Sequence, residues 1–329
     1  MAIEHRVVET NGVRLHCAVG GSGPLVIFLH GFPEFWYSWR HQLAALEPHF
    51  QVVAPDLRGY NESDKPAGVQ AYDLPVLVAD VAGLIAAFGA REAVIVGHDW
   101  GGGIAWQFAM DRPDLTKKLV VMNCPHIAIF GQALRSSPKQ LLKSWYMFFF
   151  QTPVLPELAL GVGHAWPIAN NMRSNAVQKD AITDEYIEKL RDACMRPGVL
   201  RSAVNYYRAA FRNDRFSAHL PPTVRRFLYG DREFPAVAGG LEDWPKISAP
   251  TMLIWGEQDF ALEKELTYGM DPLFTKSPRI EYVPDSGHWV PQEKADLVNK
   301  LLLDFLGDVS DASVKSFPMP DAPPDAPPA

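Results

Sequence analysis

The stretch from Ala93 to Met110 restricts the fold more than any other part of the chain. It begins with "AVIVGH" (93–98), an apolar run without alternation, and passes through the tight turn "GHDWGG" (97–102) into a helical pattern. A short strand that is apolar on both faces is typical of a parallel sheet covered by helices on both sides. The stretch therefore predicts a strand, a turn and a helix within a doubly wound α/β sheet.

Similar units lie on both sides of this stretch. Further strand patterns occur at 12–19, 25–31, 51–56, 117–123, 251–256 and 279–283, and helix patterns occur at 74–90, 184–195, 199–212 and about 292–306. The strands returning after residue 250 are too few for a second sheet, so we expect one core that a helical segment interrupts. The predicted division is a core at 1–125, a helical cap at 126–243, the rest of the core at 244–309, and a disordered Pro/Ala-rich tail at 310–329.

The composition excludes several classes of function. The net charge of −7 gives no sign of nucleic-acid binding, and no apolar run is long enough to span a membrane. The N-terminal segment lacks the apolar core of a secretion signal, so we expect a cytoplasmic protein. The three cysteines have no metal-binding spacing, and we expect neither a metal nor a cofactor. A homodimer is left open.

Asp99 stands at the centre of the turn, where a G-x-S-x-G turn has its serine. Gly97 and Gly101 relieve the crowding that such a sharp turn creates. The central side chain then projects at the carboxyl edge of the sheet, beside a helix N-terminus that favours an anion. Asp99 is therefore either a helix cap or a nucleophile.

Two later motifs favour the nucleophile. The segment "WGEQDF" places Asp259 just after a returning strand, and "DSGHWVPQE" places His288 in a loop before the last helix. Nucleophile, acid and histidine follow one another in this order along α/β-hydrolase chains. We therefore expect Asp99, Asp259 and His288 to form a catalytic triad.

With these motifs the sequence resembles the epoxide hydrolases of the α/β-hydrolase fold family, over essentially all of residues 1–308. The resemblance rests on "HGFPEFWYSW", "DLRGY", "GHDWGG", "WGEQD" and "SGHWVPQE". It implies a mostly parallel sheet with an inserted helical cap, and an oxyanion hole formed by the backbone N–H groups of Phe32 and Trp100. Many relatives carry glycine after "RGY"; Asn61 at this position tolerates the left-handed backbone that the turn needs.

The resemblance also implies two tyrosine acids in the cap. Tyr146 lies in "SWYMFFFQTP" and Tyr207 in "VNYYRAAFR"; the neighbouring Tyr206 falls where many relatives carry Trp, so Tyr207 is the better match. The alternative is that both tyrosines are aromatic packing within the cap. We further expect the substrate pocket to be lined by His30, Pro33, Trp145 and Phe150.

A carboxylate nucleophile favours an alkyl substrate over an acyl one. Attack on an acyl carbon would give an anhydride, whereas displacement at an sp³ carbon gives an ester that water can hydrolyse. An opening epoxide leaves an alkoxide, which a tyrosine O–H of pKa about 10 can protonate. The predicted activity is therefore conversion of a neutral, apolar epoxide and water to a vicinal diol.

Two alternative functions stay open at this point. Haloalkane dehalogenases share the "GHDWGG" turn, and the indole N–H of Trp100 could bind a halide. They tend to have Asn where this chain has Phe32, or a second Trp in the cap, for which Trp145 and Trp166 are candidates. The second alternative is a ligand-binding module without catalysis, although such modules usually keep the serine.

Two other positions compete with Asp259 for the role of the acid. Asn123 occupies the site that some dehalogenases use, but an amide is not an acid, which favours Asp259. Asp231 lies inside the predicted cap, away from the returning strands.

Overall fold

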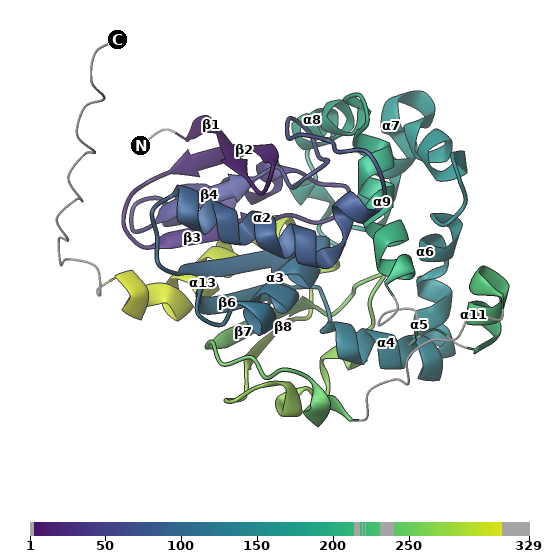
Figure 1. Ribbon diagram of the computed structural model, residues 1–329. Helices are drawn as coiled ribbons and strands as arrows, with labels where there is room; N and C mark the ends of the chain where they lie inside the picture. Colours follow the sequence, from purple (N-terminus) through teal and green to yellow (C-terminus); the bar gives the residue numbers. More distant parts are fainter. Residues whose placement is uncertain (1–2, 214–217, 219, 221, 231–239, 311–329) are drawn as a thin grey trace, which may run out of the picture.

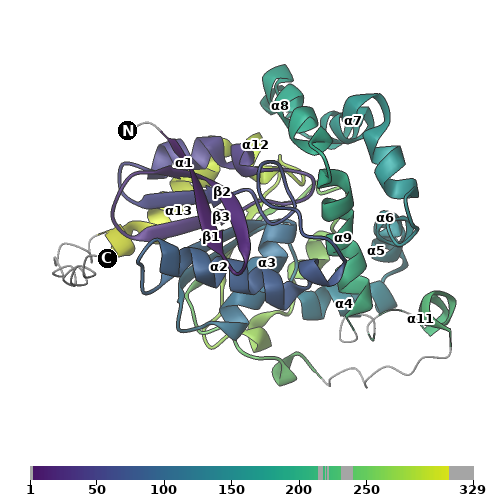
Figure 2. The same cartoon turned by 45° about the horizontal axis from the view of Figure 1, so that its top comes forward.

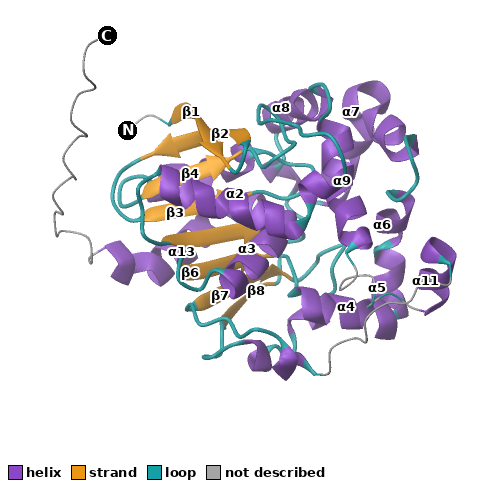
Figure 3. Ribbon diagram, viewed as in Figure 1, coloured by secondary structure: helices purple, strands orange, loops and turns teal. Residues whose placement is uncertain are grey.

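The computed structural model describes residues 3–213, 218, 220, 222–230 and 240–310. Asp231 and the predicted tail beyond residue 310 lie outside the described residues. The strands form one sheet in the order β1-β2-β4-β3-β5-β6-β7-β8 (Figure 3). Their bounds are β1 Glu4–Thr10, β2 Val13–Gly20, β3 Leu25–Leu29, β4 Gln51–Pro55, β5 Ala93–His98, β6 Thr116–Met122, β7 Thr251–Gly256 and β8 Arg279–Val283.

The sheet is parallel from β4 to β8, and β2 joins it antiparallel to β4. Its alternate residues pack into separate apolar layers: Ile27 and Ile95 belong to one cluster, and Phe28 and Val96 to the other. Both layers exclude water, which is why these strands read as unbroken apolar runs. The doubly wound fold expected from the sequence is confirmed.

Helices cover both faces of the sheet. The first cluster includes residues of α2 and α3, and the second includes residues of α1 and α13 (Figure 2). The core helices are α1 Arg40–Leu46, α2 Leu74–Ala87, α3 Trp100–Asp111, α12 Val290–Glu293 and α13 Ala295–Ser310. A single helix was expected near 292–306; instead α12 and α13 are separated at Lys294, whose backbone is not helical.

A group of helices lies together at one end of the sheet, opposite α13 (Figure 1). These helices come between β6 and β7 in the chain and form the expected cap. They are α4 Ile127–Ser136, α5 Pro138–Lys143, α6 Trp145–Phe149, α7 Leu155–Asn175, α8 Asp184–Met195, α9 Val199–Arg212 and α11 Pro222–Tyr229. The boundaries predicted at residues 125 and 243 stay predictions.

The sequence did not reveal β1. Most of its side chains are exposed, so it carries no apolar pattern, and it is an edge strand paired only with β2. Asn61, expected to accept a left-handed backbone, has φ of 37°. Its side chain also donates a hydrogen bond of 2.8 Å to Asp56, which fixes the turn after β4.

Candidate active site

Asp99 lies between β5 and α3 in a strained backbone conformation, with φ 49° and ψ −121°. A Cβ on Gly97 would lie 2.3 Å from the carbonyl oxygen of Gly101, and one on Gly101 would lie 2.0 Å from that of Leu29. Only glycine fits at either position, because any side chain would collide with backbone. The Asp99 side chain forms no capping hydrogen bond with α3. The helix-cap interpretation therefore does not account for it.

The loop after β3 holds one oxygen of the Asp99 carboxylate. The backbone N–H of Phe32 donates to Oδ1 at 2.7 Å. A Cβ on Gly31 would lie 2.5 Å from the Cβ of Asp99, so the close approach of this loop needs glycine there. Trp100 is the first residue of α3, and no hydrogen bond joins its N–H to the carboxylate. Of the two predicted oxyanion donors, Phe32 therefore hydrogen-bonds the carboxylate of Asp99, and Trp100 does not.

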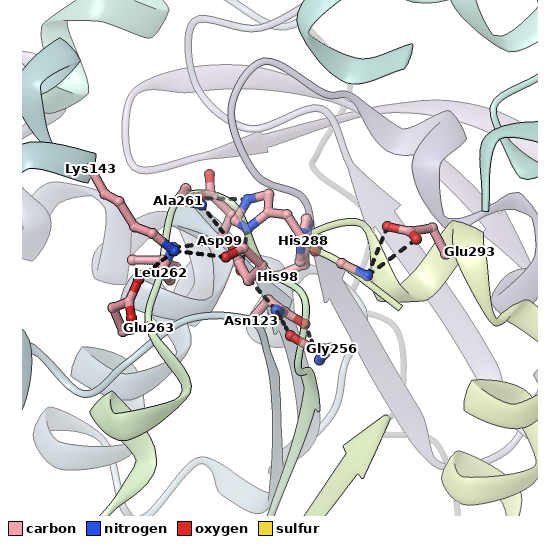
Figure 4. A network of polar contacts seen from close by, with 12 residues as sticks. His98, Asp99, Asn123, Lys143, Gly256, Ala261, Leu262, Glu263, His288 and Glu293 are labelled. Atoms are coloured by element: carbon pink, nitrogen blue, oxygen red, sulfur yellow. Dashed lines mark hydrogen bonds and ion pairs between the residues drawn. The ribbon is translucent and has the colours of Figure 1, made fainter. Parts of the chain in front are cut away.

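Asp259 and His288 complete the predicted triad. His288 Nδ1 lies 2.7 Å from Asp259 Oδ2, and its Nε2 lies 3.7 Å from Asp99 Oδ2 (Figure 4). Asp259 Oδ1 accepts hydrogen bonds from the N–H groups of Ala261 and Leu262, at 2.7 and 2.9 Å. The imidazole is thus oriented by one carboxylate and directed at the other.

Asn123 positions the acid. Its amide donates to Asp259 Oδ2 at 2.8 Å, while its own oxygen accepts the N–H of Gly256 at 2.9 Å. With φ of 41°, its backbone is left-handed, a conformation that Asn accepts more readily than most residues. The sequence analysis treated this residue only as a competing acid; its place in the fold makes it a positioning residue for Asp259.

The charges of the triad stabilise one another. Burial alone would raise the pKa of the Asp99 carboxyl, but the hydrogen bond and charge of His288 hold it below its usual range. Burial would lower the pKa of His288, yet the carboxylates of Asp259 and Asp99 raise it well above its ordinary value. The resting site therefore holds an ionised nucleophile beside an imidazole whose charged form is favoured.

A second buried polar network lies behind His288. His98 Nε2 is 2.8 Å from the carbonyl oxygen of His288, and its Nδ1 is 3.0 Å from Glu34 Oε2. Each ring nitrogen of His98 thus lies within hydrogen-bond distance of an oxygen atom. Glu34 Oε1 accepts from Tyr186 at 2.7 Å and from Gln292 at 2.5 Å. This network ties the cap helix α8 to the loop of the catalytic histidine.

Neither His98 nor Glu34 was assigned a role from the sequence. Burial would raise the pKa of Glu34, but the hydrogen bond and charge of His98 keep it below its ordinary value. Both residues adjoin predicted functional turns, at "HGFPE" and "GHDWGG". Their position beside these two turns is the sequence signal that could have marked them as residues supporting the site.

We expect Glu34→Gln to lower the free energy of unfolding by about 1–3 kcal/mol, because an amide replaces an acceptor that three buried donors share. Denaturant unfolding of the variant and the parent measures the difference. Tyr186→Phe is the matched control, since it removes one donor and should cost about 1 kcal/mol. A Glu34→Gln protein as stable as the parent would show that the network contributes nothing to folding.

The two cap tyrosines lie side by side. Tyr146 comes from α6 and Tyr207 from α9, with ring centroids 5.8 Å apart. Burial and the charge of Asp99 raise the pKa of Tyr146, and a hydrogen bond from Tyr207 opposes part of that shift. Burial also raises the pKa of Tyr207 well above its usual value, against a hydrogen bond from the Trp100 side chain. Both hydroxyls therefore keep their protons near neutral pH.

Tyr206, the neighbour of Tyr207 on α9, also belongs to the cavity wall, but its hydroxyl has a partner in the core. Its hydroxyl donates to the carbonyl oxygen of Arg58 at 2.7 Å, and its side chain is fully buried. It therefore anchors α9 to the core.

A cavity of about 280 Å³ joins Asp99 to both tyrosines. Its wall also contains the thiol of Cys124, whose pKa is raised well above its ordinary value by burial and by the carboxylates of Asp99 and Asp259. Trp244, which the sequence analysis did not single out, belongs to the wall as well. The described lining residues are Tyr72, Asp73, Leu74, Pro75, Asp99, Trp100, Gly103, Gln107, Cys124, Pro125, Ile127, Phe130, Tyr146, Met147, Tyr206, Tyr207, Ala209, Ala210, Asn213, Trp244 and Leu262.

The pocket residues predicted from the sequence are not among those that line this cavity. The side chain of Trp145, on the short helix α6, is 63% exposed. Phe150 packs behind Phe32 and Tyr207. His30 is buried and accepts a hydrogen bond of 2.9 Å from the N–H of Leu57.

Pro33 turns its carbonyl toward the Cys194 thiol, 3.5 Å away, on the cap side of the loop. It supports the loop and is not part of the cavity wall.

Comparison with known proteins agrees with this geometry. Residues 24–295 match the family model of the alpha/beta hydrolase fold. The chain is 35% identical over 306 residues to epoxide hydrolase 3 of Mus musculus, covering 92% of this chain and 76% of that protein. It is 33% identical over 308 residues to the AB hydrolase superfamily protein YfhM of Bacillus subtilis (strain 168), covering 92% and 98%.

Among solved structures, the crystal structure of Bacillus megaterium epoxide hydrolase in complex with an inhibitor superposes with a TM-score of 0.78. The two chains are 29% identical, with 92% of this chain and 100% of that chain covered. The fold and the site thus define an α/β hydrolase with aspartate at the nucleophile turn. Within that class, the chain belongs to the epoxide hydrolase family.

Proposed function

We propose that this protein hydrolyses a neutral, mostly apolar epoxide to a vicinal diol through an ester with Asp99. One observation carries the proposal: the Asp99 carboxylate and the hydroxyls of Tyr146 and Tyr207 belong to residues that line the same cavity. A nucleophile for carbon and a pair of donors for oxygen are what ring opening requires.

In the first step Asp99 Oδ2 attacks an epoxide carbon from behind. Oδ1 stays bound to the N–H of Phe32, which leaves Oδ2 as the free nucleophilic oxygen. The carbon–oxygen bond of the ring breaks, and its electron pair goes to the oxygen. Tyr146 or Tyr207 transfers a proton to that alkoxide, so the first step ends with a hydroxyalkyl ester and a tyrosinate.

In the second step His288 activates water. Ester formation removes the negative charge of Asp99, one of the charges that raise the pKa of His288. The pKa of the imidazole therefore falls, and its proton passes to the tyrosinate left by the first step, so that His288 is neutral when a base is required. Water adds to the carbonyl carbon and gives its proton to His288, while the Phe32 N–H stabilises the oxyanion. The bond between that carbon and Oδ2 then breaks, and the departing alkoxide takes the proton of the new Asp99 carboxyl, so the diol leaves with Oδ2 and Asp99 is ionised again.

The haloalkane alternative is less well supported. A halide leaving group needs weak N–H donors, yet the Trp100 side chain already hydrogen-bonds Tyr207. The candidate cap tryptophans, Trp145 and Trp166, are 63% and 57% exposed, and neither lines the cavity. A pair of buried hydroxyls beside the nucleophile suits an oxygen leaving group instead.

A single turnover in ¹⁸O-labelled water tests this function. With enzyme in excess over a styrene-oxide-like substrate, the diol should form without the label, since its second oxygen comes from Asp99. The label should appear in the peptide that contains Asp99, as measured by mass spectrometry. A labelled diol in the first turnover would mean direct attack by water, and a protein that turns over only haloalkanes, with release of halide, would contradict the epoxide proposal.

The proposal also includes the cytoplasmic location and the possible homodimer that were expected from the sequence. Within the described part of the chain, no helix is both long and apolar enough to cross a bilayer. No group of three or more His, Cys, Asp or Glu side chains is placed to hold a metal ion among the described residues. A cytoplasmic location and a homodimer stay predictions.

A further inference from the structure

The cavity extends well beyond the reacting groups. On α3 its wall contains Trp100, Gly103 and Gln107, which recur on one face of the helix. At 1.5 Å per residue, the step from Trp100 to Gln107 is about 10 Å along the helix axis. On α9 the lining residues include Tyr206, Ala209, Ala210 and Asn213, the last just past the helix end. Two helices thus line a channel that leads away from Asp99.

The middle of this channel is apolar. Besides the polar residues, the wall contains small or hydrocarbon side chains, such as Gly103, Ala210, Leu74 and Ile127. These groups offer no hydrogen bond to a ligand, and they favour a hydrocarbon chain that leaves water.

The far end of the channel is polar, and Asp73 is its only carboxylate other than Asp99 among the described lining residues. Asp73 precedes α2, and its side chain makes no capping hydrogen bond with that helix. Burial raises the pKa of Asp73, and the charge of Arg212 opposes part of that shift. None of the described residues makes a hydrogen bond to this carboxylate.

We propose that Asp73 accepts a hydrogen bond from a donor group at the distal end of the substrate, and that this contact selects the substrate. The substrate class is then an epoxide with an apolar chain and a terminal hydroxyl or ammonium group. An anionic end is disfavoured, because it would meet the carboxylate. The inference rests on the proposed epoxide hydrolysis and specifies its substrate.

A series of terminal epoxides of increasing chain length tests the contact. Each member carries an ω-hydroxyl, an ω-methyl ether or an ω-carboxylate, and kcat/KM is measured for all three. The hydroxyl compound should exceed the ether by about tenfold or more at one chain length, the value of a hydrogen bond to a charged acceptor. Shorter members, which do not reach Asp73, should show no preference, and the carboxylate should be the poorest substrate.

Variants locate the contact in the chain. Asp73→Leu should bring the ratio of hydroxyl to ether compound to about one, whereas Asp73→Asn, which keeps an acceptor oxygen, should lower it only in part. Asp114→Asn is the matched control, because Asp114 is an exposed carboxylate paired with Arg112 outside the cavity. This variant should keep the ratio of the parent protein.

The outcomes separate the two proposals. Absence of turnover for every epoxide would overturn the proposed function. Good turnover with equal kcat/KM for hydroxyl and ether at all lengths would overturn the role of Asp73 and leave the function intact. If Asp73→Leu does not fold, the comparison of tails in the parent and in Asp73→Asn decides the question.

Discussion

Replacement of His288 by glutamine should turn the protein into a reagent that reacts once with an epoxide and stops at the ester. The first step uses Asp99 and the tyrosines, so alkylation should still occur. The second step loses its base, and steady-state turnover should fall by roughly 10⁴-fold or more, as expected when a triad histidine is removed. Intact-protein mass spectrometry should show an adduct with the full mass of the epoxide.

Peptide mapping then locates the adduct. It should lie on the peptide that contains Asp99, and the double variant with Asp99→Asn should carry none. An adduct on another residue would remove Asp99 from the proposed role. An adduct formed only from a haloalkane would support haloalkane dehalogenation instead of epoxide hydrolysis.

Replacement of both Tyr146 and Tyr207 by phenylalanine should abolish epoxide opening while the fold is kept. Loss of a general acid typically costs 10²–10⁴-fold in rate, so we expect the double variant to lose about 10³-fold or more. Each single variant should lose less, because the remaining hydroxyl still reaches the epoxide oxygen. The measurement is the pre-steady-state rate of ester formation, in a His288→Gln background that prevents hydrolysis.

Tyr206→Phe is the matched control on the same helix. It loses the hydrogen bond to the carbonyl oxygen of Arg58 and should cost about 1 kcal/mol of stability, without the selective loss of ring opening. Equal rates of ester formation in the parent and the double variant would show that neither tyrosine is the acid. The cap tyrosines would then be aromatic packing, as the alternative interpretation held.

The triad could be located from the sequence because local geometry placed it. Asp99, Asp259 and His288 each follow a strand or precede a helix whose pattern is readable, and parallel strands bring their carboxyl ends to one edge of the sheet. The structure brings all three side chains together. The turn glycines were equally readable, since their role depends on backbone alone.

The pocket was much harder to predict. Trp145 and Tyr146 are neighbours on α6, yet one is exposed and the other lies on the cavity wall. Which face of a short helix turns inward depends on packing between cap and core, and the sequence of so short a helix does not record it. The Glu34–His98 pair was missed for a related reason: its partners come from distant parts of the chain.

The channel beyond Asp99 was also invisible in the sequence. Asp73, Gln107 and Asn213 belong to three separate elements, and none lies in a recognisable motif. Their proximity follows from how α9 lies across the core. The residues that line the channel are therefore set by tertiary packing, whereas the residues of the triad could be located from short sequence motifs at turns.

Cys124 belongs to the wall of the cavity, and the protonation state of its thiol decides whether an epoxide can alkylate it. A cysteine beside a reactive epoxide is exposed to irreversible alkylation, and it is the thiolate that attacks carbon. The carboxylates of Asp99 and Asp259, together with burial, keep this thiol protonated by raising its pKa. We therefore expect the negative charges of the site to slow alkylation of this thiol by the substrate.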